Sequence, residues 1–206
     1  EDIIKLDANE NPYGCSPRAR QALAAYPSLH VYPDAGQAEI RELLQGYTGV
    51  DAECIVACNG SDQLIDHVLS LFIEPGDEVI NCIPTFDIFR FRTQMCRGKL
   101  IEVLRDEDFS VNIDAVKRAI TKKTKIILLA TPNNPTGTIT PQKDILELAD
   151  TGVPVLVDEA YAEFSGETVT QLVSQYKNMM VLRTFSKWAG LAGLRMGYGI
   201  FPPKIA

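Results

Sequence analysis

The sequence is poor in the residues that bind metals or build disulfide frameworks. It contains two histidines, His30 and His67, neither of which has a neighbour at metal-ligand spacing, and an odd number of cysteines, five. Cys54 and Cys58 are separated by three residues, whereas zinc-binding pairs are commonly separated by about two. We therefore expect neither a metal site nor a disulfide framework, and the cysteine usage favours a reducing, cytoplasmic environment.

Basic patches and long apolar runs are also missing. The net charge is −7 and the pI is about 4.9, and no cluster of Lys and Arg provides the surface that nucleic acids require. The longest apolar stretches, 68–73 and 126–130, are far shorter than the ~20 residues of a membrane span. Residues 1–5 do not resemble the start of a secretory signal. These absences predict a soluble protein that binds neither nucleic acid nor membrane.

From residue 54 onward, short apolar runs alternate with longer segments of helical periodicity. Strands are predicted at 54–58, 78–82, 99–104, 125–130, 153–158, 179–183 and 196–201. Helices are predicted between the first six of them, at 62–72, 86–96, 113–120, 141–150 and 169–176. Strands that are apolar throughout and joined by helices indicate an α/β fold. We expect a three-layer α/β/α arrangement around a mostly parallel seven-stranded sheet.

The chain divides at about residue 35. Residues 1–35 contain one predicted helix, at 16–26, and a turn-rich segment, and are expected to form an N-terminal arm and helix. Residues 36–206 begin with a second predicted helix, at 37–47, and are expected to form the large domain that contains the sheet. The last predicted strand is followed by a turn into another helix, so we expect this domain to be incomplete at its C-terminal end.

Polar motifs follow the ends of several predicted strands. Asn134, Asp158 and Lys187 each come shortly after such an end, as does the segment 60–62. In open α/β sheets, ligands bind outside the carboxyl ends of the strands, so these residues are expected to meet at one rim. Taken singly, each has a simpler interpretation as a helix cap or a solvated side chain. Their agreement on one edge of the sheet is what predicts a site.

One part of this rim is suited to a phosphate. Gly60, Ser61 and Asp62 join a strand to a helix, which presents free backbone N–H groups and the positive end of the helix dipole. The chain has neither a Walker A lysine motif nor a Gly-x-Gly-x-x-Gly segment after a strand, and this disfavours a nucleotide. Arg195 follows Lys187 by eight residues and offers a planar fork for an anion.

Asp158 and Lys187 are the predicted acid–base groups. Asp158 ends the apolar run 154–157, so its carboxylate is expected to be desolvated and to need a cation, which a protonated pyridine nitrogen would supply. Lys187 follows Ser186 among small and apolar residues. Such surroundings and a positive neighbour lower the pKa of an ammonium group and favour the free amine that a Schiff base requires. Tyr161 can direct its phenol to the same rim.

Longer motifs give the set a specific resemblance. They occur at residues 6–14 (LDANENPYG), 32–34 (YPD), 131–137 (TPNNPTG), 158–161 (DEAY), 184–187 (TFSK) and 193–197 (GLRMG). This set, which extends over nearly the whole chain, resembles the fold type I pyridoxal phosphate-dependent aminotransferases, and among them the histidinol-phosphate aminotransferase family. The resemblance implies a homodimeric transaminase with pyridoxal 5′-phosphate as cofactor. The C-terminal small domain of that family, which recognises the anionic end of the substrate, is absent from this chain.

The resemblance also implies roles at the matching positions. Lys187 would form the Schiff base and move the proton between the substrate α-carbon and the cofactor, and Asp158 would pair with the pyridine nitrogen. Asn134 and Tyr161 would hydrogen-bond to the ring oxygen O3′. Lys187, Asp158 and Tyr161 are thereby the predicted catalytic residues. Asn134 and Tyr13, the latter in the N-terminal arm, are predicted to contact the substrate.

For the rest of the cofactor the resemblance implies a stacking residue and a phosphate-binding set. Phe86 stands where this family often has Tyr, so the stacking face is kept and the hydroxyl is lost. Tyr32 would reach the cofactor phosphate of a neighbouring subunit. Within the subunit the phosphate would be held by Gly60, Ser61, Asp62, Thr184, Ser186 and Arg195.

Several functions remain open on the sequence alone. The leading hypothesis is amino transfer from histidinol phosphate to the 2-oxo acid 2-oxoglutarate, giving imidazole acetol phosphate and glutamate in histidine biosynthesis. A second is a threonine-phosphate decarboxylase-like lyase, or an aminotransferase for another, aromatic amino acid, on the same scaffold. A third is a cofactor-binding module of a transcription regulator, but the arm at 6–14 shows no sign of the basic helix-turn-helix that such a regulator needs.

Overall fold

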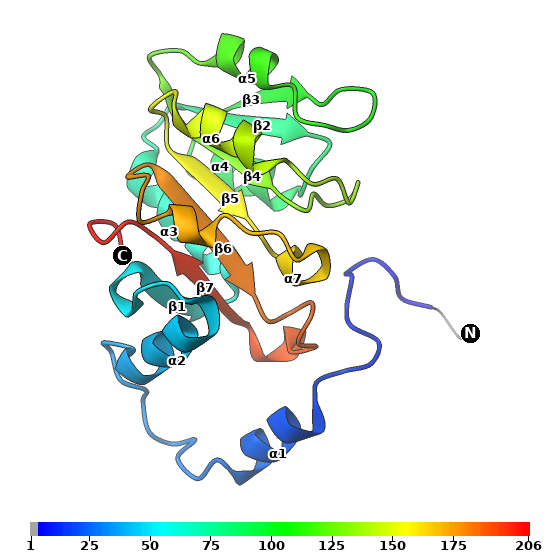
Figure 1. The fold of residues 1–206 in the computed structure, drawn as a ribbon, viewed down its shortest axis with the longest axis vertical. Coiled ribbons are helices and arrows are strands. Elements are labelled where there is room, and N and C mark those ends of the chain that lie inside the picture. Colours follow the sequence, from blue (N-terminus) through cyan, green and yellow to red (C-terminus); the bar gives the residue numbers. More distant parts are fainter. Residues whose placement is uncertain (1–3) are drawn as a thin grey trace.

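The computed structural model describes residues 4–206, so the first three residues of the predicted arm lie outside the described part (Figure 1). At its centre is a seven-stranded sheet. The strands are β1 (Ile55–Asn59), β2 (Glu78–Ile83), β3 (Lys99–Leu104), β4 (Thr124–Ala130), β5 (Val155–Asp158), β6 (Met179–Thr184) and β7 (Met196–Ile200). Each matches a predicted strand to within two residues at either end, because apolar runs rich in branched residues and bounded by turns strongly favour strands.

The sheet is parallel except at β7. Its order is β1-β7-β6-β5-β4-β2-β3. The strands from β6 to β3 pair in parallel, whereas β7 is antiparallel to both of its neighbours, β6 and β1. Residues 185–195, which connect β6 to β7, contain only a short 3₁₀ turn at Ala192–Leu194. Without a helical crossover the chain returns beside β6 in the opposite direction. The prediction of a mostly parallel sheet is confirmed.

Helices lie on both faces of the sheet, as predicted for three layers. In chain order they are α1 (Pro17–Ala25), α2 (Ala38–Thr48), α3 (Ser61–Phe72), α4 (Ile88–Met95), α5 (Ile113–Ala119), α6 (Gln142–Ala149) and α7 (Ala162–Ser165). α2, α5 and α6 pack on one face, and α3 and α4 pack on the other (Figure 1). Within residues 4–206, no helix has both the length and the apolar character needed to cross a membrane.

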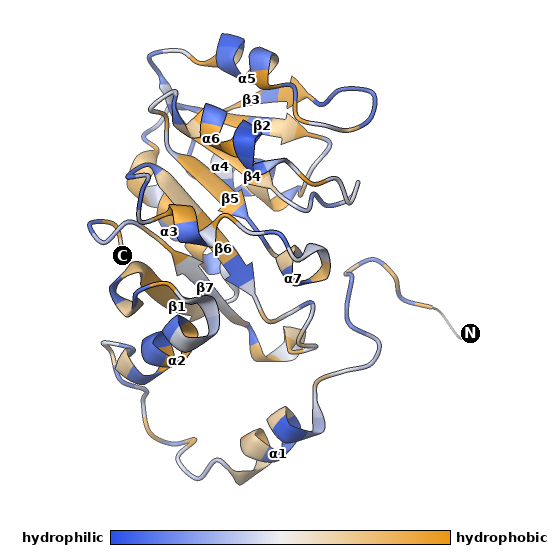
Figure 2. Ribbon diagram, viewed as in Figure 1, coloured by the Kyte–Doolittle hydropathy of each residue, from blue (hydrophilic) through white to orange (hydrophobic). Residues whose placement is uncertain are grey.

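Alternation along the strands builds one core layer on each face. In β4, the side chains of Ile127 and Leu129 belong to the layer under α2, α5 and α6, whereas those of Ile126 and Leu128 belong to the layer under α3 and α4. All four side chains are buried. Because both faces are covered, the central strands are apolar along their length, as the hydropathy colouring of β4 and β5 shows (Figure 2).

The predicted helix at 169–176 is wrong. The structure has a 3₁₀ turn at Thr170–Leu172 in this segment, followed by further turns. Val169, Thr170 and Val173 are β-branched, and branched side chains lower helix propensity. Val169 and Val173 are instead buried against the core and anchor an irregular connection. α7 has no counterpart among the predicted helices, because its four residues are too few to show a helical period.

The segment before α2 stays largely outside the core. α1 contains no buried residue, although the hydroxyl of Ser16 caps it by accepting a hydrogen bond from the backbone N–H of Ala19. Figure 1 shows α1 apart from the sheet and joined to it by extended chain on both sides. Large exposed apolar side chains of this segment are Ile4, Leu6, Tyr13, Leu23, Tyr26, Leu29, Val31 and Tyr32. An apolar surface of this extent is typical of a protein–protein interface.

Candidate active site

The carboxyl ends of β4, β5 and β6 lie at a cavity of about 480 Å³. Ala130, Asp158 and Thr184, the last residues of these strands, all line it, together with the start of α3, the loop after β6 and arm residues 7–10. The predicted site residues that line this cavity are Ser61, Asp62, Phe86, Asn134, Asp158, Tyr161, Thr184, Ser186, Lys187 and Arg195. Residues more than 130 positions apart therefore meet at one rim of the sheet.

One end of the cavity has the geometry of an anion site. Gly60 has a φ of +80°, and a Cβ at this position would lie 2.3 Å from Nη2 of Arg195. Only glycine therefore lets the guanidinium lie against the start of α3. The first turn of α3 has no side-chain cap, which leaves backbone N–H groups free at the positive end of the helix dipole. Arg195 itself is in the left-handed region, with a φ of 53°, a strained conformation typical of functional sites.

Hydroxyl groups complete this end of the cavity. Thr184 Oγ1 donates to Ser186 Oγ at 2.9 Å and accepts from the Ser186 N–H at 3.1 Å. Arg195 Nη1 lies 3.5 Å from Ser186 Oγ, and Arg195 Nη2 lies 3.0 Å from Asp62 Oδ2. The pair with Asp62 is partly exposed and therefore weak. N–H groups, hydroxyls and a guanidinium together match the acceptor oxygens of a phosphate group.

Asp158 is a buried carboxyl group with no ion-pair partner among residues 4–206. Its Oδ1 accepts a hydrogen bond from the backbone N–H of Ala160 at 3.0 Å. Burial nevertheless raises the pKa of Asp158 to about 7, and the charges of Asp62 and Glu159 add to the rise, whereas Lys187 opposes it. A buried carboxylate of this kind gains most from a ligand that places a positive charge beside it.

Lys187 lies on the loop after β6 with its amine at the cavity. Nζ donates to the backbone oxygen of Ala8 at 2.7 Å and lies 5.9 Å from the centroid of the Tyr161 ring. Burial lowers the pKa of Lys187, and the charge of Arg195 lowers it further, although the carboxylate of Asp62 opposes this change. The lowered pKa enlarges the fraction of neutral amine, which is the form that attacks a carbonyl carbon.

Tyr161, Asn134 and Phe86 also line the cavity. The Tyr161 hydroxyl oxygen accepts a hydrogen bond from Nδ2 of Asn9 at 2.9 Å, so its own hydrogen remains available for a ligand. Phe86 packs edge-on against Phe89, with ring centroids 6.0 Å apart. It lies in the turn before α4 rather than inside the predicted helix, because α4 begins two residues later. The cavity thus combines an aromatic wall with convergent polar groups.

Three predicted site residues do not line the cavity: Gly60, which directly precedes the lining residue Ser61, and the two tyrosines Tyr13 and Tyr32. The side chains of the two tyrosines are 94% and 97% exposed. Both belong to the segment before α2, whose apolar side chains also face solvent. Tyr32 is predicted to reach the cofactor phosphate of a neighbouring subunit. Tyr13 is predicted to contact the substrate and help close the pocket over it. Both roles stay predictions.

Four lining residues that the sequence did not indicate come from the N-terminal arm. They are Asp7, Ala8, Asn9 and Glu10. Ala8 contacts Lys187 at a sequence separation of 179 residues, and Asn9 contacts Tyr161 at a separation of 152. Their one sequence signal is membership of the motif at 6–14. Neither hydropathy nor periodicity locates an extended, exposed arm, so their place over the cavity follows only from the path of the chain.

A buried ion-pair network supports the turn after β5. Arg183 Nε lies 2.8 Å from Glu159 Oε2, and Arg183 Nη1 lies 2.7 Å from Glu163 Oε1. Glu159 also accepts a hydrogen bond from the backbone N–H of Val169 at 2.7 Å. Arg183 and Glu159 are 8% and 1% exposed. Because Glu159 directly follows Asp158 in the chain, this network holds the backbone that positions the buried carboxyl group.

Replacing Arg183 with leucine is expected to lower the free energy of unfolding by about 3–5 kcal/mol, because Glu159 is then left as a buried, uncompensated charge. Urea unfolding of the full-length protein measures this change. The matched control is Arg90→Leu, since Arg90 pairs with Glu102 at 2.6 Å with both side chains largely exposed, and its loss should cost less than about 1 kcal/mol. Equal losses in the two variants would contradict the importance of burial.

The sequence matches known aminotransferases along its whole length. The family model of class I and II aminotransferases matches residues 1–206. The histidinol-phosphate aminotransferase of Dehalococcoides mccartyi strain CBDB1 is 59% identical over 204 residues, which are 99% of this chain and 57% of the relative. Histidinol-phosphate aminotransferase 1 of Arabidopsis thaliana, a chloroplastic enzyme, is 44% identical over 207 residues, covering 100% of this chain and 50% of the relative. The chain thus spans about half the length of these relatives.

Solved aminotransferase structures have the same fold as this chain. A crystal structure of a histidinol-phosphate aminotransferase homologue from Erwinia carotovora atroseptica superposes with a TM-score of 0.90 at 28% identity, covering 98% of this chain and 62% of the other. The histidinol-phosphate aminotransferase of Sinorhizobium meliloti in complex with pyridoxal-5′-phosphate gives a TM-score of 0.87 at 25% identity, and the match covers 96% of this chain and 56% of the other. With the match of the family model over its full length, the chain belongs to the class I and II aminotransferase family.

Proposed function

We propose that the full-length protein containing this chain is a pyridoxal phosphate-dependent aminotransferase. Its reaction would convert histidinol phosphate and 2-oxoglutarate into imidazole acetol phosphate and glutamate, in histidine biosynthesis. The observation that carries the proposal is the presence, in one cavity, of an amine with a lowered pKa, a buried carboxyl group and an anion site. The named relatives support the choice of substrate, and one of the similar structures contains pyridoxal-5′-phosphate.

The residues of the cavity fit the parts of this cofactor. Its phosphate would be held by the first turn of α3, the Ser186 hydroxyl and the Arg195 guanidinium, which already lie together. Its ring nitrogen would pair with Asp158, whose carboxyl group lacks a cationic partner within residues 4–206. Tyr161 would donate its free hydroxyl hydrogen to the ring oxygen, beside Asn134. The support for this assignment is chemical: the cavity contains an anion site, a carboxyl group and a hydrogen-bond donor, which are the partners that a phosphate, a ring nitrogen and a ring oxygen require.

When bound, the cofactor supplies an electron-poor ring that accepts the electron pair of the bond broken at the substrate α-carbon. Asp158 keeps the ring nitrogen protonated, because a buried carboxylate beside a cation stays ionised. Lys187 provides an amine that is neutral in a larger fraction than an exposed lysine, so it can take a proton from the α-carbon and later return it. Arm residues 7–10 line the cavity, and the backbone oxygen of Ala8 accepts a hydrogen bond from this amine.

The proposal includes a cytoplasmic homodimer in which residues 1–35 form the arm and residues 36–206 the cofactor-binding large domain. The exposed apolar side chains before α2 support such an interface. Tyr32 would reach the cofactor phosphate of the neighbouring subunit, and Tyr13 would close the pocket over the substrate. Phe86, at the wall of the cavity, would stack on the cofactor ring.

Adding histidinol phosphate to the cofactor-loaded full-length protein is expected to convert the cofactor absorbance to that of its amino form. Subsequent addition of 2-oxoglutarate should restore the first spectrum and release glutamate. Absorbance spectroscopy and a glutamate assay measure the two half-reactions. An aromatic amino acid that reacts where histidinol phosphate does not would reassign the substrate. Release of carbon dioxide without consumption of a 2-oxo acid would contradict the aminotransferase proposal and indicate a lyase.

A further inference from the structure

One arm residue outside the cavity lining contacts the backbone that carries Lys187. Nδ2 of Asn11 donates to the carbonyl oxygen of Lys187 at 3.3 Å and to that of Trp188 at 3.2 Å. Its Oδ1 accepts a hydrogen bond from the backbone N–H of Tyr13 at 3.0 Å. Asn11 is half-buried, unlike most of the arm. A single amide side chain therefore links a turn of the arm to two successive carbonyl groups of the loop that carries Lys187, residues 185–195.

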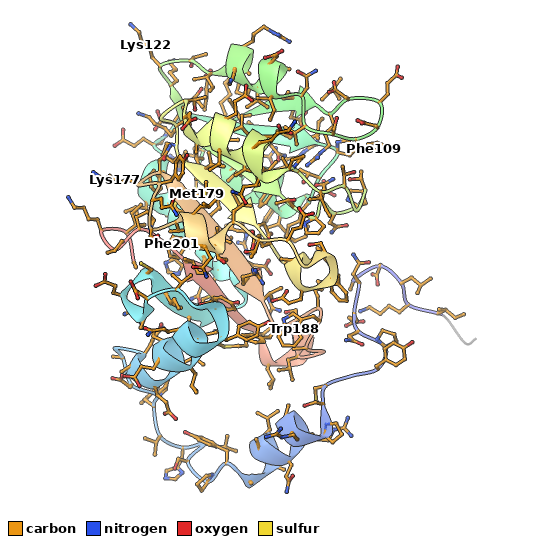
Figure 3. The ribbon with its side chains drawn as sticks, viewed as in Figure 1. Phe109, Lys122, Lys177, Met179, Trp188 and Phe201 are labelled. Atoms are coloured by element: carbon orange, nitrogen blue, oxygen red, sulfur yellow. The ribbon has the colours of Figure 1, made fainter. Side chains whose placement is uncertain are left out.

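The loop around Lys187 depends on contacts of this kind because it contains no α-helix. On one side, Trp188 stacks on Tyr47 of α2, with ring centroids 5.9 Å apart and planes 8° apart. Trp188 is labelled in Figure 3. On the other side the loop meets the arm. A Cβ at Gly190 would lie 2.3 Å from the backbone oxygen of Gly14, so the two backbones are in direct contact. The arm and α2 thus hold opposite sides of the segment that presents the amine.

We propose that Asn11 is a positioning residue for Lys187, holding the carbonyl groups of Lys187 and Trp188 so that the amine stays at the cavity beside Ala8. This inference rests on the proposed function, since it concerns the lysine that would react with the cofactor. Asn11 touches neither the cofactor site nor the reacting atoms. Its effect passes through the backbone of the loop.

The position of the loop also sets the surroundings of the amine. Burial, the first cause of the lowered Lys187 pKa, depends on keeping the side chain against the arm and the strand ends. The charged and titratable groups that face the amine are Glu10 of the arm, Asp62 of α3, Asp158 of β5, Tyr161 after β5 and Arg195. A looser loop would expose the amine to water, and its pKa would rise toward the ordinary value for lysine.

Two variants separate the donor of Asn11 from its acceptor. Asn11→Asp keeps an oxygen for the Tyr13 N–H but cannot donate to the two carbonyl groups. Asn11→Ala removes both interactions without adding a charge near Lys187. An effect shared by both variants is due to the lost donor. The matched control is Asn178→Ala, because Nδ2 of Asn178 donates in the same way to two carbonyl groups, those of Ala149 at 2.8 Å and Val153 at 3.1 Å, at the other end of β6.

The test uses the cofactor-free full-length protein, incubated with pyridoxal 5′-phosphate, reduced with borohydride and analysed by mass spectrometry for modified Lys187. Both Asn11 variants are expected to need roughly tenfold more cofactor for half-maximal modification, because small misplacements of a reacting group cost up to ~100-fold. In Asn11→Ala the pH midpoint of the modification rate should also rise, since a higher amine pKa requires a higher pH for the neutral form. Asn178→Ala should lower the melting temperature and leave both quantities unchanged.

Several results would overturn the role of Asn11. Asn11 variants with wild-type half-saturation and pH midpoint would show that the contact is only structural. An equal change in Asn178→Ala would show that the readouts follow general destabilisation. Absence of modified Lys187 in the unsubstituted protein would be a different failure, because it would refute the proposed function itself and with it any positioning role toward that reaction.

Discussion

Lys187→Ala in the full-length protein is expected to lower the transamination rate by at least ~10³-fold, because one amine both attaches the cofactor and moves the proton. The variant should still bind pyridoxal 5′-phosphate through the anion site and Asp158, but borohydride should leave no covalent link between cofactor and protein. A spectroscopic assay measures the transamination rate, and mass spectrometry of the reduced protein detects the covalent link.

A lysine at the other end of β6, remote from the cavity, serves as the control. Lys177 is exposed and precedes β6, at the end opposite to the loop that carries Lys187 (Figure 3). Lys177→Ala is expected to retain the rate and the reducible link. A link retained at its wild-type level in Lys187→Ala would refute the assignment of the reacting amine.

Asp158→Asn is expected to reduce the rate by roughly 10²- to 10³-fold, the usual cost of losing one preorganised electrostatic partner. The amide has nearly the same shape and can still accept the hydrogen bond from Ala160, so the fold should be kept. What is lost is the negative charge that would keep the ring nitrogen protonated. Steady-state kinetics and cofactor titration measure the effect, and a rate within about threefold of the unsubstituted enzyme would remove Asp158 from the mechanism.

Asp158→Asn also has a consequence for the cofactor-free protein. Folding raises the pKa of Asp158 from its ordinary value of 3.8, which applies in the unfolded chain, to about 7. Because the folded pKa is the higher one, the contribution of this group to stability is complete below the unfolded value and is lost as the pH rises through the folded value. The free energy of unfolding should therefore fall between about pH 4 and pH 7.

The part of this pH dependence that is due to Asp158 should disappear in the variant. A pKa difference of one unit corresponds to about 1.4 kcal/mol, so the loss attributable to Asp158 should exceed ~1 kcal/mol. Urea unfolding of the unsubstituted protein and of Asp158→Asn, both free of cofactor, at a series of pH values measures it. Parallel stability curves for the two proteins would contradict the raised pKa.

The strands and the rim could be predicted from local properties of the sequence. The run that ends in Asp158 is apolar throughout, which indicates a buried strand, and a polar residue at the end of such a strand has to lie at its carboxyl edge. The same reasoning locates Lys187 after β6 and Asn134 after β4. It does not require knowledge of which strands are neighbours, because in a parallel sheet all carboxyl ends lie on one edge.

The irregular parts could not be predicted in this way. The segment 169–176 has apolar residues at a spacing that fits a helix, but its branched side chains and its burial favour turns. The direction of β7 depends on the absence of a helix between residues 185 and 195, and a glycine-rich loop gives no periodic signal of its path. In both segments, tertiary packing overrides the local pattern.

The sequence by itself determined the fold class, the seven strands and the group of residues that includes Asp158, Lys187 and Arg195, because hydrophobic periodicity and strand ends are local properties. Only the tertiary structure decided that arm residues 7–10 line the cavity and that Asn11 holds the loop of Lys187. It also decided that Tyr13 and Tyr32 face solvent in a single chain. The positions of the arm residues depend on contacts between segments more than 150 residues apart, and such contacts are set by the path of the whole chain.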